Sequence, residues 1–200
     1  MNPELRMIIK TLKEGGLVAW PTDTTWGLLA AADNTLTLER IYELKGRPRQ
    51  KPLQLLISEL PVAEKLTDIR RAGPQWFLLA KRFWPGGLTL VAPASAAAPT
   101  DLVYKGKLGL RLPADTELRE VISALGGRLA ATSLNRSGEE PVGSFEEAVR
   151  LAGWVDYIRA GAAPGVASSV YELPEGRLLR AGAVSSDEIA SALEETWTEN

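Results

Sequence analysis

The amino-acid sequence predicts a single α/β domain over residues 1–200, built on a twisted, open, mixed sheet with flanking helices. Two observations predict it. Segments with apolar residues at helical spacing alternate along the chain with short, continuous apolar segments that are typical of buried strands. In addition, 200 residues with 45% hydrophobic content can bury one sizeable core, and the one biased stretch, Ala92 to Thr100, is too short to separate two domains.

The first half of the chain opens with a helix. Asn2 is a suitable N-cap with Pro3 at the first helical position, and an apolar stripe formed by Leu5, Ile8, Ile9 and Leu12 follows. The expected elements are then, in order, a helix end at Gly15-Gly16, a strand over 17–20, a turn over 21–27, a small-residue apolar segment, a helix over 35–44 and a strand over 53–57. The continuous aliphatic run 53–57 favours a strand buried on both faces, although periodicity alone also permits a helix.

The second half continues the alternation. The expected elements are a helix around Trp76 to Phe83, strands over 88–91 and 108–112, a helix from Asp115 to Leu125, a strand over 129–132 and a late hairpin joining 168–170 to 180–182. Two capping boxes, Ser144 with Glu147 and Ser185 with Glu188, predict two further helix starts. The strand order is left open by these patterns.

The amino-acid composition excludes several kinds of catalytic and metal-binding site. The chain has no cysteine and no histidine, which excludes disulfides, thiol nucleophiles, Cys- or His-ligated metal sites and imidazole acid–base catalysis. Its net charge of −2 gives no global attraction to nucleic acid or to a membrane surface. No apolar run reaches the roughly 20 residues of a membrane span, and the N-terminus lacks the order of a signal peptide. We therefore expect a cytoplasmic protein with no membrane partner.

A basic loop is the first candidate site. Lys45-Gly46-Arg47-Pro48-Arg49-Gln50-Lys51-Pro52 places four cations in seven residues, with a glycine for close approach. Lysine supplies a point charge and arginine a planar fork, so together they can hold a triphosphate. The alternative is a solvated basic loop. Neither a P-loop motif nor a GxGxxG motif is present, which disfavours the common nucleotide-binding folds.

Other candidate residues interrupt the apolar pattern where strands are expected to end. They are Thr24 in the turn Pro21 to Leu28, Ser133 and Asn135 after the strand over 129–132, Arg111 between two leucines, and Ser168, Ser169 and Arg180 at the ends of the late hairpin. Ser133 and Asn135 project to the same side if strand geometry persists between them. Hydrogen-bonded turns and a solvated strand face are the alternatives.

Taken together, these segments resemble the YrdC-like threonylcarbamoyl-AMP synthase family. The resemblance rests on seven motifs in one order: PTDTTWGL at 21–28, KGRPRQKPL at 45–53, FWPGGLTL at 83–90, GLRLP at 109–113, ATSLNRSG at 131–138, SSV at 168–170 and LLRAG at 178–182. It implies the YrdC-like α/β fold and a reaction in which L-threonine, bicarbonate and ATP give threonylcarbamoyl-AMP and pyrophosphate. The product then serves a transferase complex that modifies tRNA.

The resemblance also implies roles for single residues. Lys45, Arg47 and Lys51 would meet the ATP phosphates, and Ser133, Asn135 and Arg180 would complete the nucleotide side. Thr24, Arg111, Ser168 and Ser169 would form the threonine side. No residue acts as nucleophile or general base, because a carbamate needs only alignment and electrostatic stabilisation. Mg²⁺ is expected through the ATP phosphates rather than on a protein metal site.

Departures from the family pattern are concentrated at Thr25-Trp26, where Val-Tyr is usual. We expect Trp26 to keep an aromatic wall in the pocket while offering an indole donor in place of a phenol. The chain also ends soon after LLRAG, as in the short bacterial members of the family.

Two other hypotheses remain. One is a double-stranded RNA or tRNA-binding module without synthase activity, in which the basic loop and Arg70, Arg71, Lys81 and Arg82 supply weak phosphate contacts. The net charge weighs against it. The other is a carbamoyl-adenylating relative that uses carbamoyl phosphate, a domain expected in a much longer chain.

Overall fold

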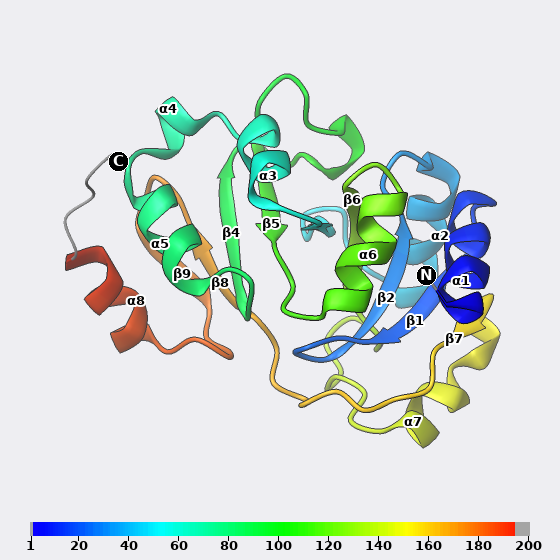
Figure 1. Ribbon diagram of the computed structural model, residues 1–200. Coiled ribbons are helices and arrows are strands. Elements are labelled where there is room, and N and C mark those ends of the chain that lie inside the picture. Colours follow the sequence, from blue (N-terminus) through cyan, green and yellow to red (C-terminus); the bar gives the residue numbers. More distant parts are fainter. Residues whose placement is uncertain (1, 195–200) are drawn as a thin grey trace.

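A computed structural model describes residues 2–194 as one mixed sheet with helices on both faces (Figure 1). The strand order is β7-β1-β2-β6-β3-β5-β4-β8-β9. The pairs β1–β7, β3–β5 and β4–β8 are parallel, and the other neighbouring strands are antiparallel. The strands are β1 (Val18–Pro21), β2 (Trp26–Ala31), β3 (Gln54–Ile57), β4 (Leu88–Pro93), β5 (Lys107–Arg111), β6 (Arg128–Ser133), β7 (Tyr157–Ile158), β8 (Ser169–Glu172) and β9 (Arg177–Arg180).

The predicted helices are all present, and two short ones are added. The helices are α1 (Pro3–Lys13), α2 (Thr35–Lys45), α3 (Leu60–Leu66), α4 (Ile69–Ala72), α5 (Gln75–Phe83), α6 (Thr116–Ala124), α7 (Phe145–Arg150) and α8 (Ser186–Glu194). In α1 the Asn2 side chain accepts a hydrogen bond from the Leu5 amide at 2.8 Å, and all four residues of the apolar stripe are buried. No helix within residues 2–194 is long and apolar enough to cross a membrane.

The two capping boxes close differently. At α8, Ser185 and Glu188 bond each other's backbone amides, as the sequence predicts. At α7 the Ser144 hydroxyl accepts from the Glu147 amide at 3.2 Å, whereas the Glu147 carboxylate reaches past Ser144 to the Gly143 amide at 2.7 Å. Both arrangements satisfy amides that the first helical turn leaves unpaired.

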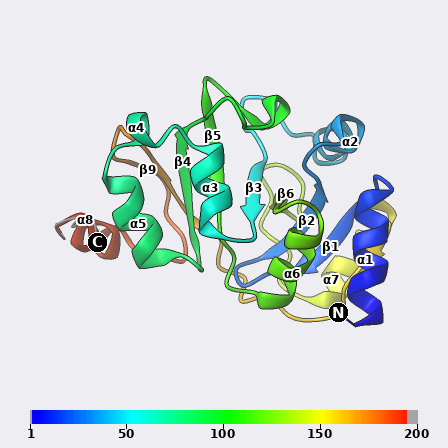
Figure 2. The same cartoon turned by 45° about the horizontal axis from the view of Figure 1, so that its top comes forward.

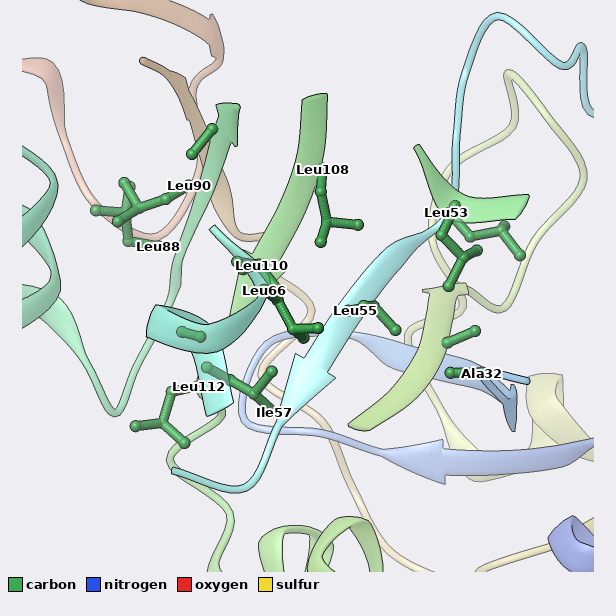
Figure 3. Close-up of a cluster of buried hydrophobic side chains, with 14 of the residues drawn as sticks. Ala32, Leu53, Leu55, Ile57, Leu66, Leu88, Leu90, Leu108, Leu110 and Leu112 are labelled. Atoms are coloured by element: carbon green, nitrogen blue, oxygen red, sulfur yellow. The ribbon is translucent and has the colours of Figure 1, made fainter. Parts of the chain in front are cut away.

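Side-chain alternation along the strands separates two hydrophobic clusters. On one face the strands pack against α2, α3, α4, α5, α7 and α8; on the other face they pack against α1 and α6. Figure 2 shows α5 and α8 toward one end of the sheet and α1 toward the other. In β3, Leu55 and Ile57 join the first cluster with Leu66 of α3 and Leu110 of β5, while Leu56 joins the second (Figure 3). Burial on both faces confirms the strand predicted over 53–57.

Helices α1 and α6 cover only part of their face. The residues that alternate with the first cluster along β5, β4 and β8 line a cavity and are not covered by a helix. They are Lys107, Gly109, Arg111, Thr89, Val91, Val170 and Glu172, together with Ser168 directly before β8. The fold therefore leaves half of one sheet face open, with polar and charged side chains on it.

Candidate functional site

The main cavity lies over this open half of the sheet and has a volume of about 580 Å³. Its floor comes from β3, β4, β5 and β8, and the loop between α2 and β3, the end of β6 and strand β9 complete its walls. An outer recess of about 810 Å³, lined by the loop 133–141 and by residues 165–167 and 179–182, shares Arg47, Lys51, Ser133 and Arg180 with it. The two form one continuous site large enough for a nucleotide and a second small ligand.

The cavity is strongly cationic although the chain is slightly acidic. Seven cationic side chains line it, namely those of Arg47, Lys51, Lys105, Lys107, Arg111, Arg177 and Arg180, against the single carboxylate of Glu172. Glu172 is itself bound by Lys107 at 3.0 Å and by Arg177 at 2.5 Å, which lowers the pKa of its carboxyl group. An enclosed surplus of positive charge selects anionic ligands.

The basic loop is held in shape by Arg47. Its Nε donates to the Lys51 carbonyl at 2.6 Å, and its Nη2 donates to the Pro52 carbonyl at 3.0 Å. Burial lowers the pKa of Arg47, and the neighbouring Arg180 lowers it further. Arg47 and Lys51 both line the main cavity and the outer recess, so the structure brings these two predicted phosphate ligands together.

Lys45 lies deeper than the other cations of the loop and is only 2% exposed. Its ammonium donates to the Ser133 carbonyl at 2.5 Å and to the Asn135 carbonyl, with the Asn135 Oδ1 at 3.5 Å. Burial and the charge of Arg47 lower the pKa of Lys45 to about 7. The geometry makes Lys45 a clamp on the turn after β6, at the edge of the outer recess.

Asn135 continues this clamp. Its Nδ2 donates to the carbonyls of Arg136 at 2.9 Å and Glu139 at 2.7 Å, which folds the loop back on itself. Strand geometry stops at Ser133, so the same-side projection of Ser133 and Asn135 does not arise from a continuing strand. Both residues nevertheless line the outer recess. Their contact with nucleotide remains a prediction.

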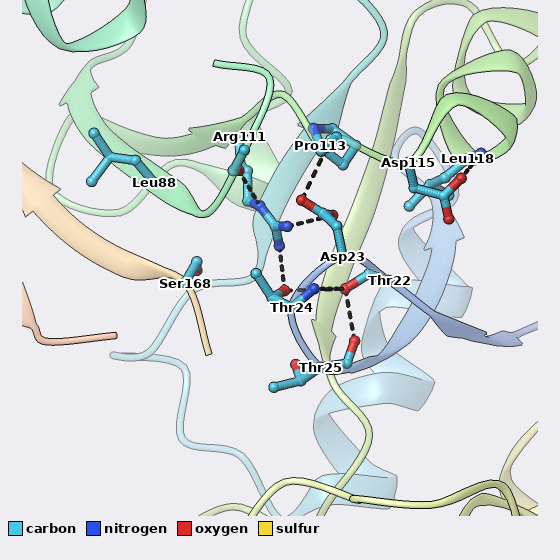
Figure 4. Close-up of polar contacts among 12 residues, drawn as sticks. Thr22, Asp23, Thr24, Thr25, Leu88, Arg111, Pro113, Asp115, Leu118 and Ser168 are labelled. Carbon is cyan, nitrogen blue, oxygen red and sulfur yellow. Dashed lines mark hydrogen bonds and ion pairs between the residues drawn. The ribbon is translucent and has the colours of Figure 1, made fainter. Parts of the chain in front are cut away.

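Arg111 is as enclosed as Lys45, at 2% exposure. Its Nη2 donates to Asp23 Oδ1 at 2.5 Å, its Nη1 to Thr24 Oγ1 at 2.7 Å and its Nε to the Gly86 carbonyl at 2.9 Å (Figure 4). Asp23 Oδ2 in turn accepts from the Ala114 amide at 3.0 Å. These bonds fix the guanidinium plane from three sides, and Arg111 lines the cavity in this fixed orientation.

The hydroxyls near Arg111 divide into two groups. Thr24 and Ser168 line the main cavity, and Arg180 donates to the Ser168 hydroxyl at 2.9 Å and to its carbonyl at 2.7 Å. Ser169 points to the opposite face of β8, where it is fully buried and its hydroxyl binds the backbone of Val184. Alternation along the strand thus separates the Ser168-Ser169 pair, and the Ser169 side chain does not reach the cavity.

The expectation that Trp26 forms a wall of the pocket is wrong. Trp26 is fully buried in the first cluster and packs on Phe145 of α7, with 6.1 Å between ring centroids. Its neighbour Thr25 faces the main cavity instead. Successive side chains of a strand point to opposite faces, so residue 25 and residue 26 cannot both face the cavity.

Several polar residues of the site were not singled out from the sequence, among them Lys105, Lys107, Glu172 and Arg177. Three more are Asp23, Gln54 and Thr89. Asp23 orients Arg111, while Thr89 and Gln54 lie on the cavity floor and are hydrogen-bonded to each other at 2.9 Å. Each was quoted within a motif or a strand, but single polar residues in apolar strands carry no distinctive signal. Period-two alternation with the buried leucines would have placed Gln54 and Thr89 on the open face. Among residues 2–194, no group of three His, Cys, Asp or Glu residues could hold a metal ion.

Comparisons with known proteins agree with this architecture. The Sua5_yciO_yrdC family model, described as "Telomere recombination", matches residues 10–182. Over 96% of the chain, threonylcarbamoyl-AMP synthase of Bacillus subtilis (strain 168) is 34% identical and that of Pyrococcus abyssi (strain GE5 / Orsay) is 36% identical. The chain spans 57% and 58% of the length of these two relatives.

Solved structures of related proteins have the same fold. The crystal structure of P. abyssi Sua5 complexed with L-threonine superposes with a TM-score of 0.87 at 34% identity, covering 96% of this chain and 58% of that one. Escherichia coli YciO superposes with a TM-score of 0.84 at 24% identity, covering 94% of this chain and 95% of that one, and this match supports the fold. The open nine-stranded sheet, the order of the seven motifs and these matches together show that the chain belongs to the Sua5/YciO/YrdC family.

Proposed function

We propose that the chain is a threonylcarbamoyl-AMP synthase, which converts L-threonine, bicarbonate and ATP into threonylcarbamoyl-AMP and pyrophosphate. The observation that carries the proposal is the main cavity, where the oriented guanidinium of Arg111 lies with six other cations over a floor of hydroxyls. The names of the relatives in the same family support this reaction in preference to other uses of an anion-binding cavity.

The nucleotide side of the proposal uses Arg47, Lys51 and Arg180, which face both the main cavity and the outer recess. These cations would hold the triphosphate and stabilise the charge that develops on the departing pyrophosphate. Lys45 and Asn135 would act by shaping the turn that presents Ser133, since their polar atoms are bonded to that turn.

The amino-acid side uses Arg111 for the substrate carboxylate, as a bidentate pair within the pocket. Thr24 and Ser168 lie beside it and would meet the amine and hydroxyl of threonine. Ser169 is not part of this amino-acid side, because its hydroxyl is hydrogen-bonded to the backbone of Val184 on the other face of the sheet.

The reaction needs no protein nucleophile. The threonine amine combines with bicarbonate to give a carbamate and water, and a carbamate oxygen then attacks the α-phosphorus while pyrophosphate leaves. The site must align these groups and exclude water from them. Glu172 is the only carboxylate among residues 2–194 that lines the main cavity, and it is bound by Lys107 and Arg177. We therefore propose that Mg²⁺ enters with the ATP phosphates and supplies charge neutralisation there.

Further expectations come with this assignment. The adenylate would pass to a tRNA threonylcarbamoyl-transferase complex, and the protein would act in the cytoplasm. Arg70, Arg71, Lys81 and Arg82 are exposed on α4 and α5, so weak tRNA or double-stranded RNA binding stays an alternative that the same experiment can address.

The test is to incubate the protein with ATP, Mg²⁺, ¹⁴C-bicarbonate and L-threonine, and to follow pyrophosphate and a labelled adenylate. We expect both products, and neither when threonine is left out. A matched variant, Arg111→Met, should lose product while Arg128→Met, at an arginine outside the site, should keep it. Salt-dependent binding of RNA without pyrophosphate release would favour the RNA-binding alternative.

A further inference from the structure

A chain of hydrogen bonds crosses the floor of the main cavity. Arg180 Nη2 lies 2.9 Å from Ser168 Oγ, Ser168 Oγ lies 2.9 Å from Thr89 Oγ1, and Thr89 Oγ1 lies 2.9 Å from Gln54 Oε1. The four residues come from four separate segments and all line the cavity. Thr89 and Ser168 are 2% and 3% exposed, so bulk water does not compete for their hydroxyls.

The direction of each bond follows from the donors available. Gln54 Oε1 can only accept, so the single hydroxyl proton of Thr89 is directed to Gln54. Thr89 cannot also donate to Ser168, and the Ser168 proton is therefore directed to Thr89. Ser168 Oγ also accepts from Arg180. Both hydroxyls then have no proton left for the cavity and offer it one lone pair each.

Hydroxyl lone pairs on the cavity floor select a ligand group that donates a hydrogen bond. The positive charge around the floor determines whether that donor is charged or neutral. Arg180 is in direct contact with Ser168, and burial, together with the charge of Arg111, lowers the pKa of Arg180. An ammonium group placed here would face the guanidinium of Arg180 directly, at an energetic cost. A neutral donor, either a side-chain hydroxyl or the N–H of a carbamate, meets the lone pairs without that repulsion.

We propose that Gln54 is a positioning residue that sets this polarity: its amide oxygen directs the protons of Thr89 and Ser168 away from the cavity, so that Ser168 accepts from a neutral donor of the amino-acid substrate. The inference rests on the proposed function for the identity of that substrate. Without an acceptor at residue 54, the Thr89 proton can turn to Ser168, and the Ser168 proton can then turn into the cavity. The floor would change from acceptor to donor. A substrate hydroxyl could then accept from Ser168, but in a cavity lined mainly by cationic donors its own proton would be left without an acceptor.

The experiment compares kcat/KM for L-threonine and L-valine in the wild type, Gln54→Met, Gln54→Glu and Ser168→Ala, with Gln75→Met on α5 as the matched control. Gln54→Met and Ser168→Ala should each remove the hydrogen bond from the substrate hydroxyl to Ser168. The ratio of kcat/KM for threonine to kcat/KM for valine should then fall about tenfold in both variants. Gln54→Glu keeps an acceptor and should keep the ratio, as should Gln75→Met. In the double variant Gln54→Met/Ser168→Ala the ratio should fall no further than in Ser168→Ala alone, because Gln54 acts through Ser168.

A threonine-to-valine ratio in Gln54→Met within twofold of the wild type would overturn the inference. So would an equal effect of Gln54→Met in the presence and absence of the Ser168 hydroxyl. The bond itself can be tested without substrate, by a double-mutant cycle of Gln54→Met and Thr89→Val in urea unfolding. A coupling indistinguishable from zero overturns the inference even if the protein is not a synthase, whereas clear coupling without threonine turnover would overturn the proposed function alone.

Discussion

Replacing Asp23 by Asn should destabilise the protein far more than a typical loss of a surface carboxylate. The Arg111 side chain is 3% exposed and Asp23 is 16% exposed, with 2.5 Å between Nη2 and Oδ1. Removing one charge of a buried pair leaves the other uncompensated, which costs about 3 to 5 kcal/mol. The Asp23→Asn variant also replaces the Oδ2 acceptor of the Ala114 amide by a donor. We therefore expect the upper part of that range.

The assay is urea unfolding followed by tryptophan fluorescence, read as a change in midpoint at unchanged m-value. Asp33→Asn is the matched control, because Asp33 and its partner Arg128 are 63% and 30% exposed at 2.8 Å. An exposed pair of this kind contributes about 0 to 1 kcal/mol. In the double variant Asp23→Asn/Arg111→Met the loss should be much less than the sum of the two single losses. Additive losses, or an Asp23→Asn effect no larger than that of Asp33→Asn, would refute the reasoning.

Three further changes test other parts of the site. Arg47→Ala should lower kcat/KM for ATP at least about 100-fold while the unfolding free energy changes little, and normal turnover in folded protein would remove Arg47 from the site. Trp26→Phe should leave the KM for threonine within about twofold of the wild type, because the ring lies on the far face of β2; a large change in KM would contradict this. Because the pKa of Lys45 falls to about 7 on folding, the folded state binds fewer protons than the unfolded state between pH 7 and 10. The unfolding free energy of the wild type should therefore rise with pH relative to Lys45→Met, by at most about 1.4 kcal/mol per pH unit, and a flat difference would exclude the lowered pKa.

Local patterns predicted most elements because each obeyed one clear rule. The stripe from Leu5 to Leu12, the aliphatic run 53–57 and the box at Ser185 all appear as expected. Strand β2 was expected only as a small-residue apolar segment, and helices α3 and α4 and strand β7 were not predicted at all. The last three have seven, four and two residues, too few for a periodic signal to emerge. Strand order, which decides what meets in the cavity, depends on contacts between distant segments and cannot be read from local pattern.

The site was predicted where residue type alone carried chemistry. Arg47, Lys51 and Arg111 are cations that interrupt an apolar or glycine-rich context, whereas Arg180 was assigned through the resemblance to the family; all four line the cavity. Which face a side chain takes was harder to predict. Trp26 and Ser169 are each adjacent in sequence to a residue that faces the cavity. Because neighbouring side chains point to opposite faces of a sheet, both lie on the face away from the cavity. Asp23 and Gln54 matter through the partners they orient, and those partners are distant in sequence.

The central claim is that the open half of the sheet binds ATP and L-threonine side by side. A crystal structure of the protein with L-threonine and a non-hydrolysable ATP analogue tests it most directly. We expect phosphate oxygens on Arg47, Lys51 and Arg180, and the threonine carboxylate on Arg111 with its hydroxyl beside Ser168. Nucleotide bound on the face covered by α3 and α5, or threonine bound away from Arg111, would contradict it.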